Sequence, residues 1–247
     1  HILAAAVRKL HPKVQLAIGP PIENGFYYDF GNLKIIEEDL IKIEDEMKTI
    51  LKKGLVFKKE RVSKADAKKR LKNQPYKIEL LNDLKEDITF YKTGDAFEDL
   101  CSGPHVNSTS EIKHFKLLRI AGAYWKGDSN NVMLTRIYGT AFPSKKELDD
   151  YLKQLEEAEK RNHIKLGKEL GIFMISELVG KGLPIWLPKG NIIKEEVEKL
   201  AKEKEEKAGY VRVTTPHLAK KELYLKSGHL PYYQESMYPA MKMDDGE

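Results

Sequence analysis

The chain has 247 residues, of which 41% are hydrophobic and 33% charged, and its formal net charge is +5. This balance is typical of a soluble globular protein with one large or two smaller domains. It excludes a membrane-spanning helix, because no apolar run approaches the roughly 18 residues that a bilayer requires. The modest positive charge is compatible with a nucleic-acid partner but does not require one. A single cysteine excludes an internal disulfide, so we expect a cytoplasmic protein.

The first 142 residues carry the signals of a domain that combines helices and strands. Helical spacing predicts a helix in HILAAAVRKL, ended by Pro12, and strands are expected in VQLAIGP and FYYDF. Residues 35–51 predict an amphipathic helix, and Ser63 with Asp66 three residues later marks the start of another. The stretch AYWKGDSNNVMLTRIYG predicts a β-hairpin, because aromatic and β-branched runs flank a polar loop.

The composition changes beyond residue 142. A capping box of Ser144 and Glu147 predicts the start of a long charged helix that connects two domains. Further along, GLPIWLPKG predicts a pair of apolar strands and YVRVTTP a single strand. Between them, residues 192–207 predict a helix that ends at Gly209. Residues 189–207 contain six lysines and six glutamates, so we expect a solvated helix face rather than a nucleic-acid patch.

One short stretch, CSGPHV, combines the only cysteine of the chain with a histidine four residues later. The Gly103-Pro104 pair excludes a regular helix, so a tight turn can hold the sulfur of Cys101 near the imidazole of His105. The ordinary interpretation is a small buried thiol and a structural histidine. A zinc site needs more ligands than these two, and a catalytic pair lacks any recognisable nucleophile motif. The two residues alone leave all three interpretations open.

Three other polar residues suit the same chemistry. His1 begins the first predicted helix, Lys77 lies in PYKIEL, and Asp99 in FEDLC precedes the cysteine by two residues. With the turn, they would provide a base or water-orienting group, a cation for an oxyanion, and partners for a leaving hydroxyl. This set fits water-driven hydrolysis of an acyl ester, provided that the side chains converge.

Long strings of the sequence resemble one enzyme family. HILAAAVRKLHPKVQLAIGPPIENGFYYDF, DLCSGPHV and FKLLRIAGAYWKGDSNNVMLTRIYGTAF resemble the editing domain of bacterial-type threonyl-tRNA synthetases. HIKLGKELGIF, GLPIWLPKGNIIKEEVEKL and VTTPHLAKKELYLKSGHLPYYQESMY resemble the linker helix and the start of the class II catalytic domain. The resemblance is colinear over the chain. It implies an α+β fold with an editing domain of mixed sheet and helices over residues 1–142, a linker helix over 143–170, and the truncated N-terminal part of an antiparallel-sheet catalytic domain over 171–247.

The resemblance also implies catalytic residues. The family pairs an H-x-x-x-H helix with a C-x-x-x-H turn in its editing pocket. Cys101 and His105 match the turn, and His1 matches the second histidine of the helix. Because the first histidine would lie four residues earlier, we expect this chain to be a segment of a longer protein. Lys77 and Asp99 match two further catalytic positions of that pocket.

Other positions and partners follow from the same resemblance. Tyr28 matches a substrate-binding position that lines the pocket, and Pro216 matches the class II motif 1 proline at a dimer interface. Motifs 2 and 3 and the zinc ligands of the synthetic site do not occur in the sequence, so we expect no aminoacylation. The implied partners are the acceptor end of tRNA(Thr) and, for the full-length enzyme, a second copy in a homodimer. ATP, Mg and Zn are implied for the full-length synthetase and no cofactor for this segment.

The implied function is proofreading by hydrolysis of mischarged seryl-tRNA(Thr). Serine lacks only one methyl group of threonine, which supports roughly 10–200-fold discrimination in one pocket, so a second, smaller pocket is needed. One alternative is an editing module of the alanyl-tRNA synthetase type, in which His1, Cys101 and His105 would contribute to a zinc site. The other is a non-catalytic tRNA-binding or dimerisation module. The threonyl resemblance favours a metal-free pocket.

Overall fold

The computed structural model describes residues 1–84, 88–180 and 182–241. The chain divides into two compact units, His1–Arg161 and Asn162–Glu247, which we call the first and the second unit. Among the described residues, no helix has both the length and the apolar content that crossing a lipid bilayer requires. Helices and antiparallel sheets occur together, which confirms an α+β fold.

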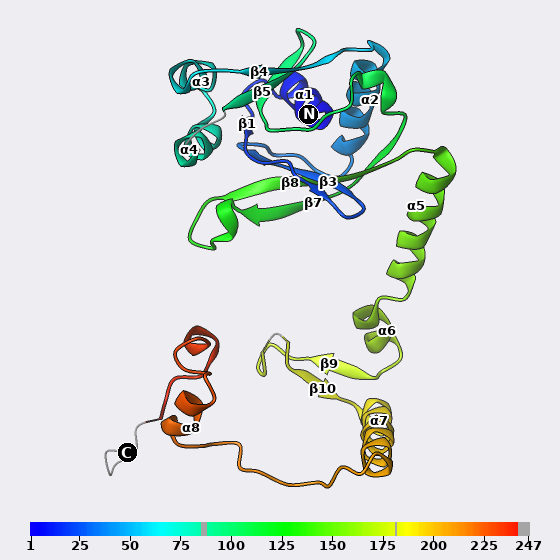
Figure 1. Ribbon diagram of the computed structural model, residues 1–247. Coiled ribbons are helices and arrows are strands. Elements are labelled where there is room, and N and C mark those ends of the chain that lie inside the picture. The colour runs from blue at the N-terminus through cyan, green and yellow to red at the C-terminus, as the bar shows by residue number, and fades with distance from the viewer. Residues whose placement is uncertain (85–87, 181, 242–247) are drawn as a thin grey trace. The chain divides into compact units, whose positions relative to one another are not determined.

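The larger sheet of the first unit is antiparallel. It consists of β1 (Gln15–Leu16), β2 (Pro21–Ile22), β3 (Gly25–Gly31), β7 (His114–Tyr124) and β8 (Met133–Phe142). The strand order is β1-β3-β8-β7, and β2 pairs with β3. The long β7–β8 pair confirms the predicted hairpin (Figure 1). Side chains alternate along β3, so Tyr28 and Phe30 belong to the core while Asp29 lies on the opposite face.

A second sheet carries the candidate site. It contains β4 (Phe57–Arg61), β5 (Thr89–Thr93) and β6 (Phe97–Leu100) in the order β4-β5-β6. Every described strand pair in both sheets is antiparallel, and the combination of sheet and helices agrees with what the sequence resemblance implied for an editing domain. Short connections join β2 to β3, β5 to β6 and β7 to β8. Two strands that are joined by a short connection and pair with each other run antiparallel.

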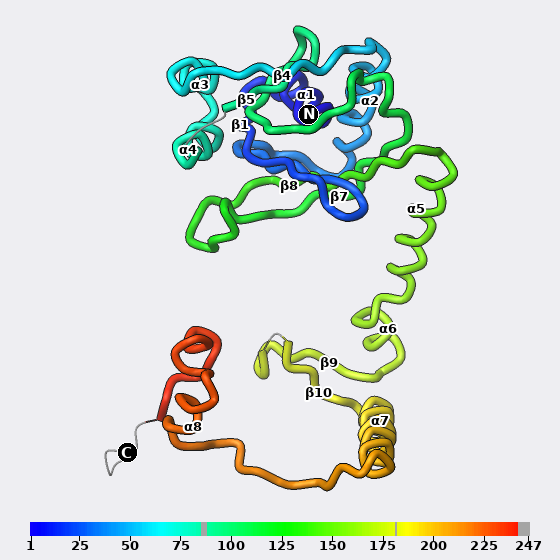
Figure 2. The backbone as a smooth tube through the Cα atoms, viewed as in Figure 1, coloured from blue at the N-terminus to red at the C-terminus, as the bar shows by residue number. Residues whose placement is uncertain are grey.

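One helix occupies the centre of the first unit. In α1 (Ile2–Leu10), every residue from Ile2 to Val7 is buried, and a helix that is apolar all round must be covered on all sides. Figures 1 and 2 show α1 between the two sheets, with α2 (Asp39–Lys52) beside it. The shared core contains residues of both helices, of β3 and β8, and Phe97 of β6. The helix predicted over residues 35–51 therefore exists but begins four residues later, at Asp39.

Two short helices flank the second sheet. The side chain of Ser63 accepts the backbone N–H of Asp66 and starts α3 (Lys64–Arg70), as the sequence predicted. Pro75 opens α4 (Pro75–Asp83), where proline is favoured because its missing N–H has no partner in a first turn. Single turns of 3₁₀ helix occur at Thr109–Glu111, Trp125–Gly127 and Gln234–Ser236.

The predicted linker helix is wrong as one continuous helix. It is divided into α5 (Lys145–Lys160), which belongs to the first unit, and α6 (His163–Glu169) in the second. The capping box of Ser144 and Glu147 is confirmed at the start of α5. The chain breaks at Asn162, whose side-chain oxygen accepts the N–H groups of Ile164 and Lys165 and so starts a new helix.

The second unit contains little regular structure beyond helices. Its elements are β9 (Phe173–Ile175), β10 (Pro184–Trp186), α7 (Pro188–Lys207) and α8 (Lys221–Lys226). The strand pair predicted within residues 182–190 is wrong, because that stretch supplies only β10, which pairs with β9. Gly209 has φ +85° after α7 and confirms the predicted helix end.

The strand predicted over residues 210–216 is also wrong. The described chain is irregular there, and Val211 and Val213 are 90% and 82% exposed. A strand needs a neighbour to accept its backbone hydrogen bonds, and none of the described residues pairs with this segment. The assignment of residues 171–247 to a class II catalytic domain stays a prediction.

Candidate active site

The turn after β6 brings the predicted cysteine and histidine together. The Sγ of Cys101 lies 3.3 Å from Nε2 of His105, and the backbone N–H of Gly103 donates to the same sulfur at 3.4 Å. Gly103 has φ +77°, a conformation that favours glycine. A Cβ atom there would collide with the ring and hydroxyl of Tyr91 on β5, so both the backbone conformation and the space require glycine.

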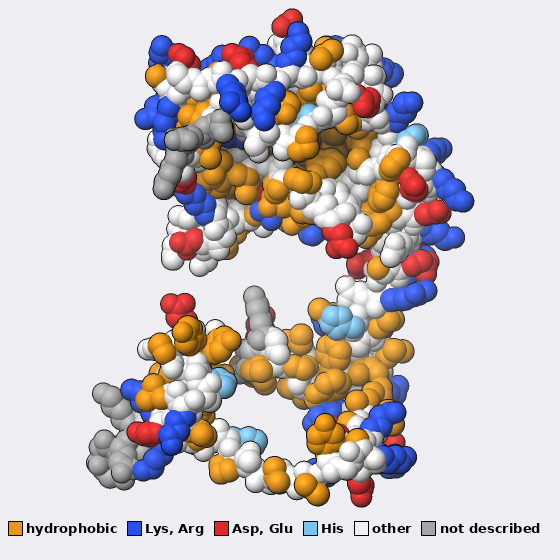
Figure 3. All heavy atoms as spheres, viewed as in Figure 1, with side chains coloured by type: hydrophobic (Ala, Val, Ile, Leu, Met, Phe, Trp, Pro, Cys, Tyr) orange, Lys and Arg blue, Asp and Glu red, His pale blue; other side chains and the backbone are white. Residues whose placement is uncertain are grey.

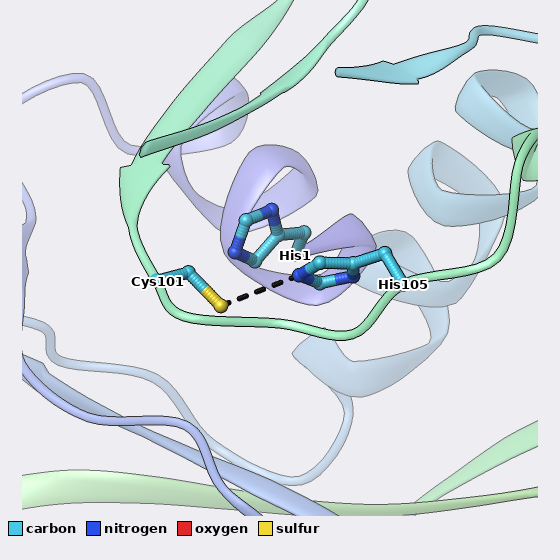
Figure 4. Close-up of side chains that lie close together, drawn as sticks. All are labelled: His1, Cys101 and His105. Carbon is cyan, nitrogen blue, oxygen red and sulfur yellow. Dashed lines mark hydrogen bonds between the residues drawn. The ribbon is translucent and has the colours of Figure 1, made fainter. Parts of the chain in front are cut away.

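His1 completes a cluster with the two residues of this turn. It is the N-cap residue of α1, and its ring centroid lies 4.2 Å from that of His105. Figure 4 shows the side chains of His1, Cys101 and His105 pointing toward one another, one from the start of α1 and two from the segment after β6. The Nδ1 of His1 is buried and has no hydrogen-bond partner among the described residues. A buried polar atom without a partner is costly, so this nitrogen is suited to a ligand atom or water.

Aromatic side chains surround the two imidazoles. The ring of Phe57 on β4 stacks on His105 with centroids 5.1 Å apart, and Tyr91 lies 4.4 Å from the same imidazole. The ring of Phe97 meets that of His1 edge-on at 5.6 Å. These contacts restrict both imidazoles to one orientation. Sequence analysis did not identify the three aromatic residues, because strand pairing alone brings them to the site.

A buried polar network adjoins the cluster. The Nζ of Lys77 on α4 lies 2.8 Å from Oδ1 and 2.9 Å from Oδ2 of Asp99 on β6. The hydroxyl of Tyr28 on β3 donates to Oδ2 of Asp99 at 2.5 Å. The three residues are only 3–4% exposed. Asp99 therefore receives hydrogen bonds from two other elements and compensates the buried charge of Lys77.

The network and the cluster are connected through one strand. Asp99 is in β6 and Cys101 follows two residues later, so both side chains leave the chain on the same side. The backbone N–H of Cys101 donates to the carbonyl of Thr89 at 3.0 Å, and the hydroxyl of Thr89 donates to the carbonyl of Cys101 at 2.7 Å. This pairing extends the hydrogen-bond ladder between β5 and β6 by one residue, to Thr89 and Cys101, and so fixes the direction in which the thiol of Cys101 points.

Burial has different consequences for the titratable groups. It lowers the pKa of the His105 imidazole to about 4, while the negative charge of Asp99 acts in the opposite direction. Burial and the nearby charge of Asp99 raise the pKa of Tyr28 well above its ordinary value. At neutral pH, His105 is therefore an uncharged base and Tyr28 a hydrogen-bond donor.

Among the described residues, His1, Cys101 and His105 also form the one group with the composition of a metal site. Their ligand atoms lie within 4.8 Å of one another. A closed zinc site has four protein ligands, whereas this group offers three. Two of these residues already interact, because Cys101 Sγ and His105 Nε2 form a hydrogen bond with each other. The donor set thus fits an incomplete or open site at most.

The comparisons with known proteins decide the family. The profile described as threonyl and alanyl tRNA synthetase second additional domain matches residues 88–138, which include the turn, all of β7 and the first six residues of β8. A threonine--tRNA ligase of Streptococcus thermophilus is 52% identical over the whole chain, and those of Streptococcus mutans and Streptococcus pneumoniae are 51% identical. The chain belongs to the threonine--tRNA ligase family. It spans 39% of the length of each of these relatives.

The structure places the remaining predicted residues as follows. Tyr28 is predicted to line the pocket, and the structure shows that its hydroxyl donates a hydrogen bond to Asp99. The substrate-binding role of Tyr28 stays a prediction. Pro216 is exposed in the second unit, outside any described helix or strand. Its role at a dimer interface stays a prediction.

Proposed function

We propose that the first unit hydrolyses the ester bond of seryl-tRNA(Thr) and thereby removes serine mischarged by a threonine--tRNA ligase. The convergence of His1, Cys101 and His105 beside the Lys77–Asp99 pair is the observation that carries this proposal. The segments that supply these residues are far apart in the sequence, and the family profile spans the turn. A structural cysteine and histidine would need neither a buried nitrogen without a partner nor an adjacent buried ammonium.

In this proposal, a water molecule attacks the ester carbonyl. The neutral imidazole of His105 orients the water and accepts its proton, which its lowered pKa permits at neutral pH. The bond between the acyl carbon and the ribose oxygen then breaks, and the imidazolium of His105 returns the proton to that oxygen, so that serine and the free ribose hydroxyl are released. The free Nδ1 of His1 binds a hydroxyl of the terminal ribose or the water itself. The thiol of Cys101, bonded to His105 and to the N–H of Gly103, contacts the substrate by a hydrogen bond and does not attack the carbonyl.

Lys77 supplies the positive charge for the developing oxyanion. Its ammonium has three N–H donors, and Asp99 holds the group in place without using all of them. Because the pair is buried, the ammonium does not have to reorganise when negative charge develops. The hydroxyl of Tyr28 keeps Asp99 oriented toward Lys77.

Selection of serine over threonine follows from crowding. Phe57, Tyr91 and Phe97 pack against the imidazoles, so the substrate side chain enters between rings that have little freedom to move. An additional methyl group requires these rings to shift, whereas serine fits. Discrimination by a steric clash is stronger than discrimination by a missing contact.

The proposal is tested by the release of serine from charged tRNA under single-turnover conditions. The assay uses the 247-residue chain and a second version that is extended by four residues before His1. The first of the added residues is the histidine of the family's H-x-x-x-H motif. We expect serine release but not threonine release, with Lys77→Ala slower by on the order of 10²–10³-fold, as for loss of one oxyanion donor. His105→Ala should also be slower. Equal rates for the wild type and both variants would show that the cluster is structural and favour a plain tRNA-binding module.

The same family assignment raises the question of aminoacylation. We propose that this chain does not activate threonine, because its sequence contains no motif 2 arginine to bind ATP. ATP, Mg and Zn would then act only in the full-length synthetase. Homodimer formation and most of the affinity for tRNA would also be properties of the whole enzyme. Threonine-dependent pyrophosphate exchange above background would refute this.

A further inference from the structure

A second lysine contacts the candidate active site from its rim. The Nζ of Lys59 on β4 donates to the carbonyl oxygen of Ser102 at 3.1 Å, and Ser102 directly follows Cys101. The same ammonium lies 5.8 Å from the centroid of the Tyr91 ring, which in turn packs against His105. Lys59 is therefore attached to the turn through both its backbone and its aromatic neighbour.

Strand register shows which face of the sheet Lys59 occupies. Lys59 pairs with Tyr91 across β4 and β5, and Tyr91 pairs with Asp99 across β5 and β6. Residues directly opposite in an antiparallel ladder point to the same face, so Lys59 lies on the face that carries Asp99. Its neighbour Lys58 pairs with Lys92 and points to the other face.

The two lysines at the site differ in their charge balance. Lys77 is buried and paired with Asp99, whereas Lys59 is exposed and donates to a neutral carbonyl oxygen, that of Ser102. Within the described ranges, no carboxylate forms an ion pair with Lys59. An ammonium carries three N–H donors, of which Ser102 takes one. Two donors and a full positive charge thus remain for an anion. Figure 3 shows lysine and arginine side chains gathered over β4 and β5, next to a hollow lined by hydrophobic side chains.

We propose that Lys59 binds the 5′-phosphate of the terminal adenosine of the substrate. This inference rests on the proposed hydrolysis of an aminoacyl ester. That ester is carried by the terminal ribose, and the nearest anionic group of the substrate is the phosphate on the 5′ carbon of the same ribose. With the ester carbonyl at the cluster of His1, Cys101 and His105, the phosphate lies at the rim rather than inside the pocket. Lys59 is the uncompensated cation that touches the turn at that rim.

The test compares two small substrates, 3′-seryl-adenosine with and without a 5′-phosphate, on the intact 247-residue chain. For the wild type, we expect a preference for the phosphorylated ester of about three- to tenfold in kcat/KM, typical of a charge-assisted contact at an exposed site. Lys59→Gln should lose this preference, and Lys59→Arg should keep most of it. Lys58→Gln removes the same charge from the opposite face of β4 and should behave as the wild type.

The remaining outcomes of these experiments each support or overturn the proposed role of Lys59. The proposal is overturned if the wild type does not distinguish the two esters, if Lys59→Gln keeps the preference, or if this variant slows both esters equally, which would show that Lys59 only holds the turn. Thermal unfolding of each variant checks that the fold is intact. If the wild type hydrolyses neither ester, the proposed function fails, and binding of the inert 3′-serylamino analogue decides the role of Lys59. A phosphate preference in that binding, lost in Lys59→Gln, supports it, and equal binding overturns it.

Discussion

The ammonium of Lys77 lies 2.8 Å from a carboxylate oxygen of Asp99, and the two side chains are 5% and 3% exposed. They come from a helix and a strand that are separated by 22 positions in the sequence. A buried pair of this kind is costly to break, because removal of one partner leaves the other charge without compensation. The pair therefore ties the stability of the first unit to the geometry of the candidate active site.

We predict that Asp99→Asn lowers the free energy of unfolding of the first unit by about 3–5 kcal/mol, since it leaves the Lys77 ammonium buried beside a neutral amide. Urea denaturation followed by circular dichroism measures the effect. The double variant Lys77→Met with Asp99→Leu should be markedly more stable than Asp99→Asn, because it removes both charges. A double variant as unstable as the single one would show that packing, not the uncompensated charge, explains the loss.

A second prediction concerns pH. The pKa of His105 is about 4 in the folded chain, below its ordinary value near 6.5. Between these values the unfolded chain binds more protons than the folded one, so the contribution of His105 makes the first unit less stable as pH falls from 6.5 to 4. The stability slope in this window should be smaller in His105→Gln than in the wild type. Identical slopes in unfolding experiments from pH 7 to pH 4 would contradict the assignment.

The turn itself is tested at its glycine. Gly103→Ala combines a left-handed backbone with a collision against Tyr91, and we expect it to displace Cys101 and His105 and to abolish most ester hydrolysis. Gly127→Ala is the matched control, because Gly127 has φ +74° and a Cβ there would meet no atom within 4 Å. Both variants carry the same backbone strain, of about 1 kcal/mol or more. Serine release should therefore fall far more in Gly103→Ala, and equal losses would exclude a special role for the Tyr91 contact.

The last prediction concerns the independence of the two units. Among the described residues, every buried hydrophobic side chain lies between Ile2 and Leu148, and so in the first unit. In α7, by contrast, Ile193, Val197 and Leu200 are all at least half exposed. We expect residues 1–161 alone to unfold cooperatively with nearly the stability of the whole chain, and residues 162–247 alone to show no cooperative transition. A sharp thermal transition of the isolated second unit would contradict this.

Short-range signals explain which parts of the fold the sequence predicts well. The capping pairs Ser63 with Asp66 and Ser144 with Glu147 act within one turn of helix, so their effect does not depend on the remainder of the chain. The β7–β8 hairpin is similarly local. The expected strand at residues 210–216 failed for the opposite reason, since a strand exists only where a partner accepts its hydrogen bonds.

The sequence by itself determined the family, the capped starts of α3 and α5, the hairpin and the identities of the polar residues, because each is encoded in neighbouring residues or in long colinear strings. Only the tertiary structure decided that His1 from α1 meets Cys101 and His105, and that Asp99 binds both Lys77 and Tyr28. It also brought Lys59 and Tyr91 to the turn through strand register. Contacts of this kind depend on which strands pair and on what becomes buried together, and both are set by the packing of the whole core rather than by local sequence.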